Sequence, residues 1–504
     1  MPGHRAIAAP HHLATEAGEQ MYRLGGSAVD AALSAAAVLT VVYPHNTSIG
    51  GDLVALVSED SGEPELVTAF GWAPAAAEPG AWGSSGRAPH RGPKTITVPG
   101  ALKGWKHLHE RYGRLDWATI LAPAITHAQG YPLSSSVRNA ISDTIAEVSE
   151  AASLMEKLIG PDWETATSAS NPALGRTLAR IAEVGLDDFY TGAIAEAVLG
   201  YLRTVRPDFA ATDFAEYEVR LEKPLSAGFA GHRVHTSGAP SQGFALLRLL
   251  DDLREELGGE DLTRMSDEVL ARIWLDSFTI SDDLRDSILA EGTTPAALLD
   301  RNAKPRETVP APTASGDTIG IAASDERISV SLIQSLYSWF GSLCFDESTG
   351  ILFQSRGSMF SLDPTSPQVL RPRARPAHTL MPVLVTDAAN APLLVQSTMG
   401  GKAQAQIHAR LVVNLLRGKS PSEAVDLPRW VSGPKQPGDP DRTITVESDV
   451  PQVLVDALAV GAEAGPRRVP PFSDDMGHAN IIDLRGPVPL AASDPRSNGS
   501  AWVG

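Results

Sequence analysis

Apolar residues in the first part of the chain follow two patterns. Between residues 15 and 39, alanine and leucine recur at helical spacing, which predicts helical structure packed on a core. The pair Gly25-Gly26 interrupts this pattern and predicts two helices in place of one. Short apolar runs at residues 53–57 and 65–69 predict strands.

The same patterns continue along the rest of the chain. Residues 101–205 and 243–302 have the pattern of mainly helical segments. Four shorter runs predict strands, at residues 319–323, 328–332, 383–385 and 393–396, the first two joined by a turn at 324–327. The chain is therefore expected to mix helices and strands throughout.

Two segments lack apolar periodicity. Residues 75–93 are rich in glycine, proline and alanine, which predicts a long surface loop. Residues 301–316 contain three prolines with small polar residues between them, which is typical of an exposed linker. A cut at the end of this linker would create a new C-terminus without damaging the core.

Composition and charge restrict the classes of function. The 504 residues, 43% of them apolar, can bury a large core. The formal net charge of -18 argues against a nucleic-acid partner, which favours clustered lysine and arginine, and favours solubility. The single cysteine, Cys344, excludes an intrachain disulfide framework.

The sequence also gives expectations about location and metals. The start of the chain lacks the pattern of a secretory signal, and the longest apolar run, residues 31–42, falls short of the ~20 residues that cross a bilayer. We therefore expect a cytoplasmic protein without a membrane partner. His11-His12 alone lacks the spacing of a metal motif, so neither a metal nor a cofactor is expected.

Thr318 is the strongest candidate for chemistry, because it follows the linker and opens a predicted strand. If the chain is cut before Thr318, its hydroxyl becomes a nucleophile and its free α-amino group, with a pKa of about 8, can act as the general base. The alternative is that Thr318 is an ordinary hydrogen-bonded residue at the start of a strand.

Motifs spread along residues 8–499 make the chain resemble the γ-glutamyltransferase family. They are His12-Leu13-Ala14, residues 25–32 (GGSAVDAA), Ile49-Gly50-Gly51-Asp52, Val98-Pro99-Gly100, residues 111–115 (RYGRL), residues 121–125 (LAPAI), Pro240-Ser241-Gln242-Gly243, residues 330–335 (VSLIQS), Phe340-Gly341-Ser342, residues 349–352 (TGIL), Gly400-Gly401, residues 476–479 (MGHA) and residues 493–496 (SDPR). Each fragment is moderately specific, whereas their order and spacing together are specific to the family.

The resemblance implies a fold and a maturation step. The fold would be α+β, the four-layer αββα sandwich of the N-terminal nucleophile hydrolases. Members cleave themselves before a threonine, which corresponds here to the bond between Asp317 and Thr318. Residues 1–317 would form a large subunit and residues 318–504 a small one, together a heterodimer in one intertwined domain.

The resemblance also assigns catalytic roles. Thr318 would attack the amide, and Ser335 matches a second hydroxyl that orients the nucleophile. Gly400 and Gly401 match paired glycines whose amides form the oxyanion hole, where one donor is worth about 3 kcal/mol of barrier. Ser335 on the polar face of a strand, and Gly-Gly as a plain turn, are the alternatives.

The positions that hold glutamate in the family differ here. Phe70 stands where an arginine binds the α-carboxylate, and Met359 where an aspartate pairs with the α-amino group. His378-Thr379 replaces two serines near the oxyanion, and Tyr337 replaces an asparagine. The usual zwitterion pocket is therefore not rebuilt. The pattern is similar to the γ-glutamyltransferase-like branch that includes oxamate amidohydrolase.

Three side chains are further candidates for substrate binding. Arg356 could bind a carboxylate with both its guanidinium nitrogens, or it could hold its loop by a salt bridge. His378 could contact substrate, or it could support another group. Arg87 could reach the site from its loop, or it could be a solvated charge.

These observations lead to three hypotheses of function. The first is a self-processing threonine amide hydrolase or acyltransferase acting on a γ-glutamyl-type or related small amide. The second is a genuine glutathione hydrolase or γ-glutamyltransferase with an altered pocket. The third is an uncleaved relative that binds a ligand without chemistry, which the unusual Ile319-Gly320 after Thr318 would suit. The sequence leaves further homo-oligomerisation open.

Overall fold

The computed structural model describes residues 4–82, 86–305, 317–434, 439–440, 442–460 and 465–504. Most of the predicted linker, residues 306–316, therefore lies outside the described residues. Within those residues the main strands form two antiparallel sheets, of seven and six strands.

The first sheet contains, in spatial order, β20 (Ser500–Val503), β1 (Ala6–Ala9), β9 (Asp317–Ser324), β10 (Ile328–Tyr337), β2 (Asp52–Glu59), β3 (Glu65–Ala69) and β6 (Arg220–Glu222). The second contains β19 (Leu490–Ser493), β18 (His478–Asp483), β14 (Pro392–Met399), β13 (Val383–Thr386), β8 (His232–Thr236) and β7 (Leu225–Phe229). Smaller sheets pair β4 (Tyr131–Pro132) with β5 (Ser168–Ala169), β11 (Phe345–Asp346) with β12 (Ile351–Leu352), and β15 (Trp430–Ser432) with β16 (Ile444–Glu447) and β17 (Arg467–Val469).

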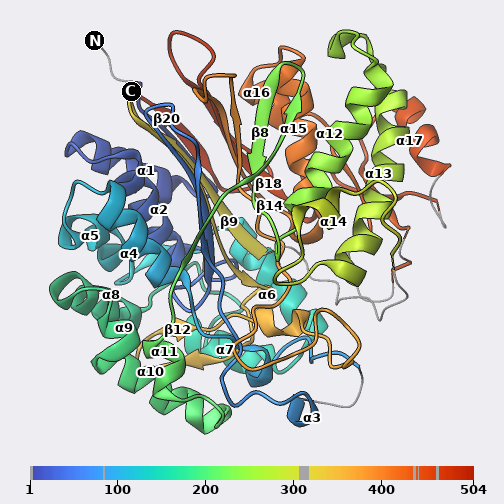
Figure 1. The fold of residues 1–504 in the computed structure, drawn as a ribbon. Coiled ribbons are helices and arrows are strands. Elements are labelled where there is room, and N and C mark those ends of the chain that lie inside the picture. The colour runs from blue at the N-terminus through green and yellow to red at the C-terminus, as the bar shows by residue number, and fades with distance from the viewer. Residues whose placement is uncertain (1–3, 83–85, 306–316, 435–438, 441, 461–464) are drawn as a thin grey trace.

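Helices cover the outer faces of both large sheets (Figure 1). On one side lie α1 (His12–Arg23), α2 (Ala28–Val42), α4 (Ala101–Tyr112) and α5 (Trp117–His127), and on the other α12 (Gly243–Leu257), α13 (Asp267–Ile288) and α15 (Gln404–Leu416). The others are α3 (Pro79–Trp82), α6 (Ser135–Glu147), α7 (Ala151–Leu158), α8 (Pro172–Val184), α9 (Asp188–Thr191), α10 (Ala193–Val205), α11 (Ala211–Ala215), α14 (Pro295–Leu299), α16 (Pro421–Asp426) and α17 (Gln452–Ala459). The predicted α+β fold with four αββα layers is confirmed.

The two first helices form for local reasons. Gly25 takes a φ of 87°, a left-handed conformation that ends the α1 segment. Ser27 then caps α2, because its hydroxyl accepts from the Asp30 amide while the Asp30 carboxylate accepts from the Ser27 amide at 2.8 Å. Every residue of α2 is buried, so the whole helix serves as core.

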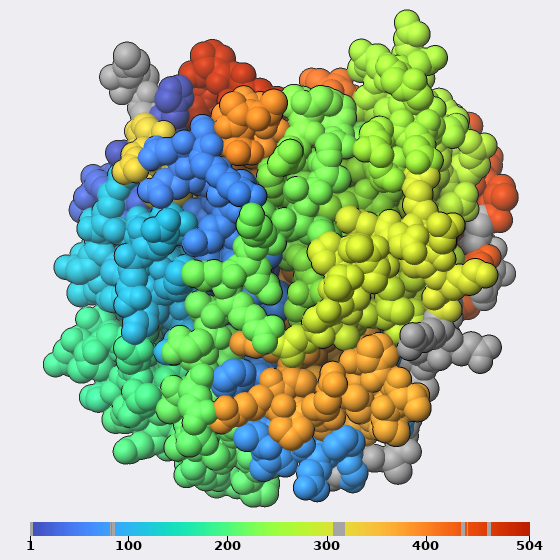
Figure 2. Space-filling model, in the orientation of Figure 1, coloured from blue at the N-terminus to red at the C-terminus, as the bar shows by residue number. Residues whose placement is uncertain are grey.

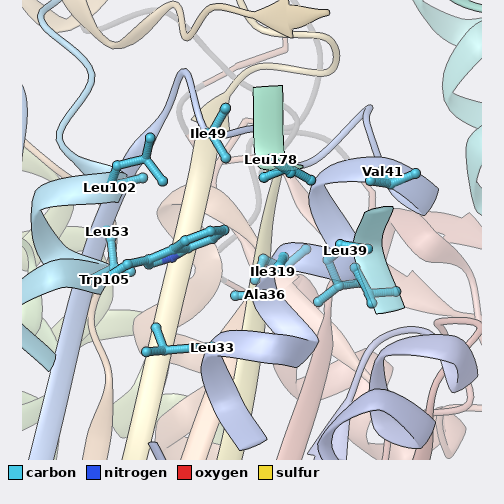
Figure 3. Packing of buried hydrophobic residues seen from close by; sticks show 14 of the residues in the cluster. Leu33, Ala36, Leu39, Val41, Ile49, Leu53, Leu102, Trp105, Leu178 and Ile319 are labelled. Atoms are coloured by element: carbon cyan, nitrogen blue, oxygen red, sulfur yellow. The ribbon is translucent and has the colours of Figure 1, made fainter. Parts of the chain in front are cut away.

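Three apolar layers hold the sandwich together. The first sheet packs on its helices through residues such as Leu33, Leu53, Trp105 and Ile319 (Figure 3). The second sheet packs on its helices through a separate cluster. A third cluster lies between the sheets and includes Val54, Leu56, Ala322, Ile333, Val395 and Ile482. Side chains alternate between the two faces of a strand, so a residue two positions from a member of this third cluster also faces the space between the sheets.

The structure differs from the sequence predictions at several places. Strands predicted at 328–332 and 393–396 are longer, as β10 and β14, and β10 therefore includes both Ser335 and Tyr337. The prediction of a surface loop at 75–93 is wrong in part, since Trp82 and Ala88 are buried against Phe360. Figure 2 shows this early segment, in blue, lying against the orange segment that contains Phe360.

Candidate active site

Four neighbouring strands bring a row of side chains to one end of the first sheet. Thr318 in β9 pairs with Ser335 in β10, and Ser335 pairs on its other side with Asp52 in β2. Phe70 follows β3, whose Ala69 pairs with Leu53. By alternation with Ala322, Ile333 and Val54, this row faces the space between the sheets. All four residues are buried.

Thr318 is the centre of this row. The residue is 1% exposed, and its hydroxyl donates to Ser335 Oγ at 3.2 Å. Ser335 Oγ also accepts from the Tyr337 amide at 2.8 Å and from Arg356 Nη2 at 3.5 Å. Thr318 and Ser335, 17 residues apart in sequence, are therefore in direct contact.

The residue after next, Gly320, sets how closely the two sheets approach. A Cβ at Gly320 would lie 2.7 Å from the Thr398 amide nitrogen in β14, which is far too close for any side chain. The Gly320 carbonyl accepts from Asn480 Nδ2 in β18 at 2.7 Å. Gly320 thus allows backbone-to-backbone packing beside Thr318.

Gly400 and Gly401 follow the end of β14 on the opposite sheet. Gly401 has a φ of 53° and begins a short 3₁₀ turn, Gly401–Ala403, that leads into α15. The Gly401 carbonyl accepts from Gln242 Nε2 at 2.8 Å, and the same amide donates to the Thr379 carbonyl at 3.1 Å. Gln242 therefore joins the glycine turn to the segment that contains Thr379.

Asp52 is the acceptor on which several of these groups converge. Its carboxylate accepts from the Gly71 amide at 2.7 Å, from Gln354 Nε2 at 2.9 Å and from His378 Nε2 at 3.1 Å. Arg356 Nε lies 4.0 Å away. Burial raises the pKa of Asp52 to about 6, and the nearby Arg356 and the hydrogen bonds oppose that rise.

His378 is a neutral, fully buried imidazole. Burial and the neighbouring Arg356 hold its pKa well below the ordinary value. The Leu380 amide donates to its Nδ1 at 3.3 Å, so the ring proton is on Nε2 and points to Asp52. Phe70 stacks on the ring, with centroids 3.8 Å apart and an interplanar angle of 15°. Phe70 and His378 thus fill the position next to Asp52 as one packed pair.

Arg356 lies beside the Thr318–Ser335 pair. Its Nη1 donates to Thr379 Oγ1 at 3.3 Å, and its guanidinium carbon stands 4.2 Å from the centre of the Tyr337 ring. Burial lowers its pKa to about 10, while Asp52 acts in the opposite direction. The side chain is thereby fixed with its Nη2 next to Ser335.

Tyr337 and Met359 close the wall behind Arg356. Tyr337 takes an unusual φ of 79°, and its hydroxyl donates to Met359 Sδ at 2.8 Å. Burial raises the pKa of Tyr337 to about 12. Arg87 lies behind this wall and is buried, donating to the Met359 carbonyl at 3.3 Å and to Gln368 Oε1 at 3.0 Å. The structure thus places Arg87 against the Met359 backbone and not in solvent.

Three residues of this arrangement received no role from the sequence: Asp52, Gln354 and Gln242. Asp52 and Gln242 belong to two of the family motifs, Ile49-Gly50-Gly51-Asp52 and Pro240-Ser241-Gln242-Gly243. The position of Asp52 directly before an apolar run is a signal of a functional site, because a carboxylate is rarely buried without partners. Gln354 gave no comparable signal. Its contact with Asp52 joins positions 302 residues apart in the chain.

Among the described residues no group of three or more histidine, cysteine, aspartate and glutamate side chains is placed to hold a metal ion. The helices of the described segments include none that combines the length and the apolar character needed to span a bilayer.

Stacked antiparallel sheets enclosed by helical layers define the fold of the N-terminal nucleophile hydrolases. The sequence model of the gamma-glutamyltranspeptidase family matches residues 14–504, and the chain belongs to that family. Enzymes of this family are hydrolases and transferases, and the chain is an amidohydrolase or acyltransferase of the same class.

Relatives agree with the branch that the motifs indicated. The chain is 31% identical over 525 residues to the oxamate amidohydrolase proenzyme of Klebsiella pneumoniae, covering 99% of this chain and 98% of that protein. It is 31% identical over 452 residues to the glutathione hydrolase-like YwrD proenzyme of Bacillus subtilis, covering 85% of each. The structure of a cephalosporin acylase from Bacillus halodurans superposes with a TM-score of 0.87, at 26% identity, covering 100% of this chain and 96% of that one.

Proposed function

We propose that this chain is a self-processing amide hydrolase whose nucleophile is Thr318. The observation that carries the proposal is the 3.2 Å hydrogen bond between Thr318 and Ser335. Thr318 lies at the start of the central strand β9 and faces the second sheet, in which β14 ends directly before Gly400. The family membership and the proenzyme names of both relatives support it.

Maturation would begin at the bond between Asp317 and Thr318. Thr318 Oγ1 attacks the Asp317 carbonyl carbon, the C–N bond breaks, and the nitrogen takes up the proton to become the free α-amino group. Water then hydrolyses the ester, leaving a carboxylate on Asp317 and restoring the hydroxyl. The products are residues 1–317 and 318–504.

Turnover would use the same hydroxyl. The α-amino group takes the hydroxyl proton as Oγ1 attacks the substrate amide, and that proton passes to the nitrogen of the departing amine. Water resolves the resulting ester and returns the enzyme; an amine in place of water would give acyl transfer. The amides of Gly400 and Gly401 would donate to the oxygen of the tetrahedral intermediate.

For substrate, we propose a small amide with a carboxylate close to the reacting carbonyl. Arg356 is held by Thr379 and Tyr337 with its guanidinium next to Ser335, so it would offer a positive charge beside the nucleophile. Phe70 and Met359 offer no charge to the α-carboxylate and α-amino group of a glutamyl substrate. Oxamate, which gives the Klebsiella relative its name, is therefore the first amide to test.

Two experiments test this proposal. Denaturing gels and intact mass of the purified protein should show fragments that meet between Asp317 and Thr318, and Thr318→Ala should stay full-length and inactive. Full turnover by an uncleaved chain would refute the proposal, whereas an uncleaved chain without activity would favour a relative that binds a ligand without chemistry.

The processed enzyme should then be given oxamate, glutathione and a chromogenic γ-glutamyl anilide in parallel. Release of ammonia from oxamate, with little amine from the anilide, is the expected result. Faster turnover of the γ-glutamyl compounds would instead identify a genuine glutathione hydrolase or γ-glutamyltransferase.

A further inference from the structure

His478 opens β18 and faces the space between the two sheets. Ile482 on the same strand belongs to the apolar cluster between the sheets, whereas Ala479 and Ile481 belong to the cluster on the helical side. Side chains alternate along a strand, so His478 and Asn480 share the inner face with Ile482. Asn480 confirms this direction, since it donates to the Gly320 carbonyl in β9.

The register between the sheets places His478 at the same level as Thr318. Ser397 in β14 donates to the Ile321 carbonyl while Thr398 stands over Gly320, so β9 and β14 run in opposite directions where they pack. β18 is antiparallel to β14 and therefore runs with β9. Two residues before Asn480 is His478, and two residues before Gly320 is Thr318. Figure 1 shows β9, β14 and β18 next to one another.

The backbone N–H and C=O groups of Thr318 point to the same edge of β9 as those of Gly320. In a strand, the N–H and C=O groups of one residue point to one edge, and the direction repeats at every second residue. The Gly320 carbonyl points to β18, where it meets Asn480. The Thr318 nitrogen, which cleavage would turn into the reactive amine, therefore points to the same edge of β9, on the side of β18, the strand that begins with His478.

His478 has hydrogen-bonding capacity that nothing else uses. His478 is 1% exposed, and neither nitrogen of its ring has a hydrogen-bond partner in the described part of the chain. A buried polar group without a partner is costly and calls for an explanation. The titratable and charged groups nearest to it are His45, Asp494 and Arg429, and burial lowers the pKa of His478 to about 4, so the ring is neutral.

We propose that His478 is a positioning residue for the nucleophile, whose ring accepts a hydrogen bond from the α-amino group freed at Thr318. This bond would hold the amine with its lone pair toward the Thr318 hydroxyl. The inference rests on the proposed function, because only cleavage before Thr318 creates that amine. In the uncleaved chain neither ring nitrogen has a hydrogen-bond partner among the described residues, and the new amine would give one of them a partner.

The test compares four processed proteins: the parent, His478→Leu, His478→Gln and His408→Gln. Leucine removes the acceptor, whereas glutamine keeps one. His408 is the matched control, a buried neutral histidine that contacts Thr398 and Gln396 from α15, on the helical side of the same sheet. Each is first checked by mass for the cut before Thr318 and by thermal unfolding for a native fold.

We expect His478→Leu to lose roughly 10- to 100-fold in kcat, because a misplaced base is slow, and His478→Gln to recover most of that loss. A neutral acceptor stabilises the ammonium form, so in His478→Leu the rising limb of kcat/KM should move to lower pH. His408→Gln should keep the parent's profile. A processed, folded His478→Leu with the parent's kcat and pH profile would overturn the inference and leave the proposed function intact.

A direct structural measurement covers the case in which His478→Leu does not fold or is not processed. In a crystal structure of the processed parent, a ring nitrogen of His478 should lie within about 3.2 Å of the Thr318 nitrogen. A separation that admits no hydrogen bond would reject the inference. Failure of the parent itself to be cut would instead reject the proposed function.

Discussion

Asp52 illustrates how one buried carboxylate organises this site. It accepts from Gly71, Gln354 and His378, and it stands beside the Arg356 guanidinium that touches Ser335. The hydrogen bonds favour its charged form and burial disfavours it, with burial the larger effect. Its charge therefore changes near pH 6, close to neutrality.

Asp52→Asn should slow the processed enzyme most at high pH. Above pH 6 the parent carboxylate is charged and accepts its hydrogen bonds fully, and a hydrogen bond to a charged group is worth about 1.5–3 kcal/mol, so we expect a loss of roughly tenfold or more in kcat at about pH 8. Near pH 5 the parent is itself largely protonated and the ratio of the two rates should approach one. Rate profiles over this range measure the ratio, and a ratio independent of pH would contradict the role.

The same shift gives a prediction for stability. The pKa of Asp52 is raised in the folded state to about 6 from its ordinary value of 3.8, so its favourable contribution is complete below pH 3.8 and is lost as the pH rises through 6. Relative to Asp52→Asn, the parent should lose up to about 3 kcal/mol of unfolding free energy over that range. Denaturant titrations test this, with Asp346→Asn, a buried carboxylate bound to Ser348 and Thr349, as the control.

Among the elements, the hairpin of β9 and β10 carries the local part of the site. The sequence predicted both strands and the turn between them. Because the two strands are adjacent in sequence, the contact between Thr318 and Ser335 joins residues that are close along the chain. The ends of the strands were not readable, because Ser335 and Tyr337 lie in β10 only as a result of pairing with β2 and β9. The helix pair α1 and α2 was predictable for a local reason, the pair Gly25-Gly26 that interrupts the helical pattern between them.

Contacts between elements could not be predicted in this way. His378 meets Asp52 across 326 positions, and the pairing of β14 with β18 that brings His478 inward depends on the second sheet as a whole. Periodicity describes one element at a time and contains no information on which strands become neighbours. The family resemblance supplied the overall fold, whereas the substitutions at Phe70 and Met359 could be interpreted only as losses until their packing was seen.

Gly320→Ala tests the packing of β9 against β14. The added Cβ would approach the Thr398 backbone to 2.7 Å, so the strands must separate, which we expect to cost about 1–3 kcal/mol of stability. Displacement of Thr318 from Gly400 should lower kcat by roughly 10- to 100-fold. Gly228→Ala in β7 is the control, since its Cβ would find only the His232 carbonyl at 3.9 Å. Equal effects of the two changes on kcat would contradict the positioning role of β9.

At the scale of the whole molecule, the proposed cut passes through an interlocked structure. β9 and β10 belong to the proposed small subunit, yet they lie between β1 and β2 of the large one. β20, near the C-terminus, pairs with β1 as well. The shared sheet and the apolar layers on both its faces would hold the two pieces as one domain.

Processed protein should therefore elute as one particle that contains both fragments, with the same native mass as uncleaved Thr318→Ala. Because backbone hydrogen bonds and apolar burial hold the pieces, and salt mainly screens exposed charges, the complex should persist in about 1 M salt and separate only in denaturant. Size-exclusion chromatography with light scattering, followed by denaturing gels of each fraction, measures this. Release of residues 318–504 by salt alone would show that the subunits meet at a polar interface, and it would contradict the sharing of one sheet by the two fragments.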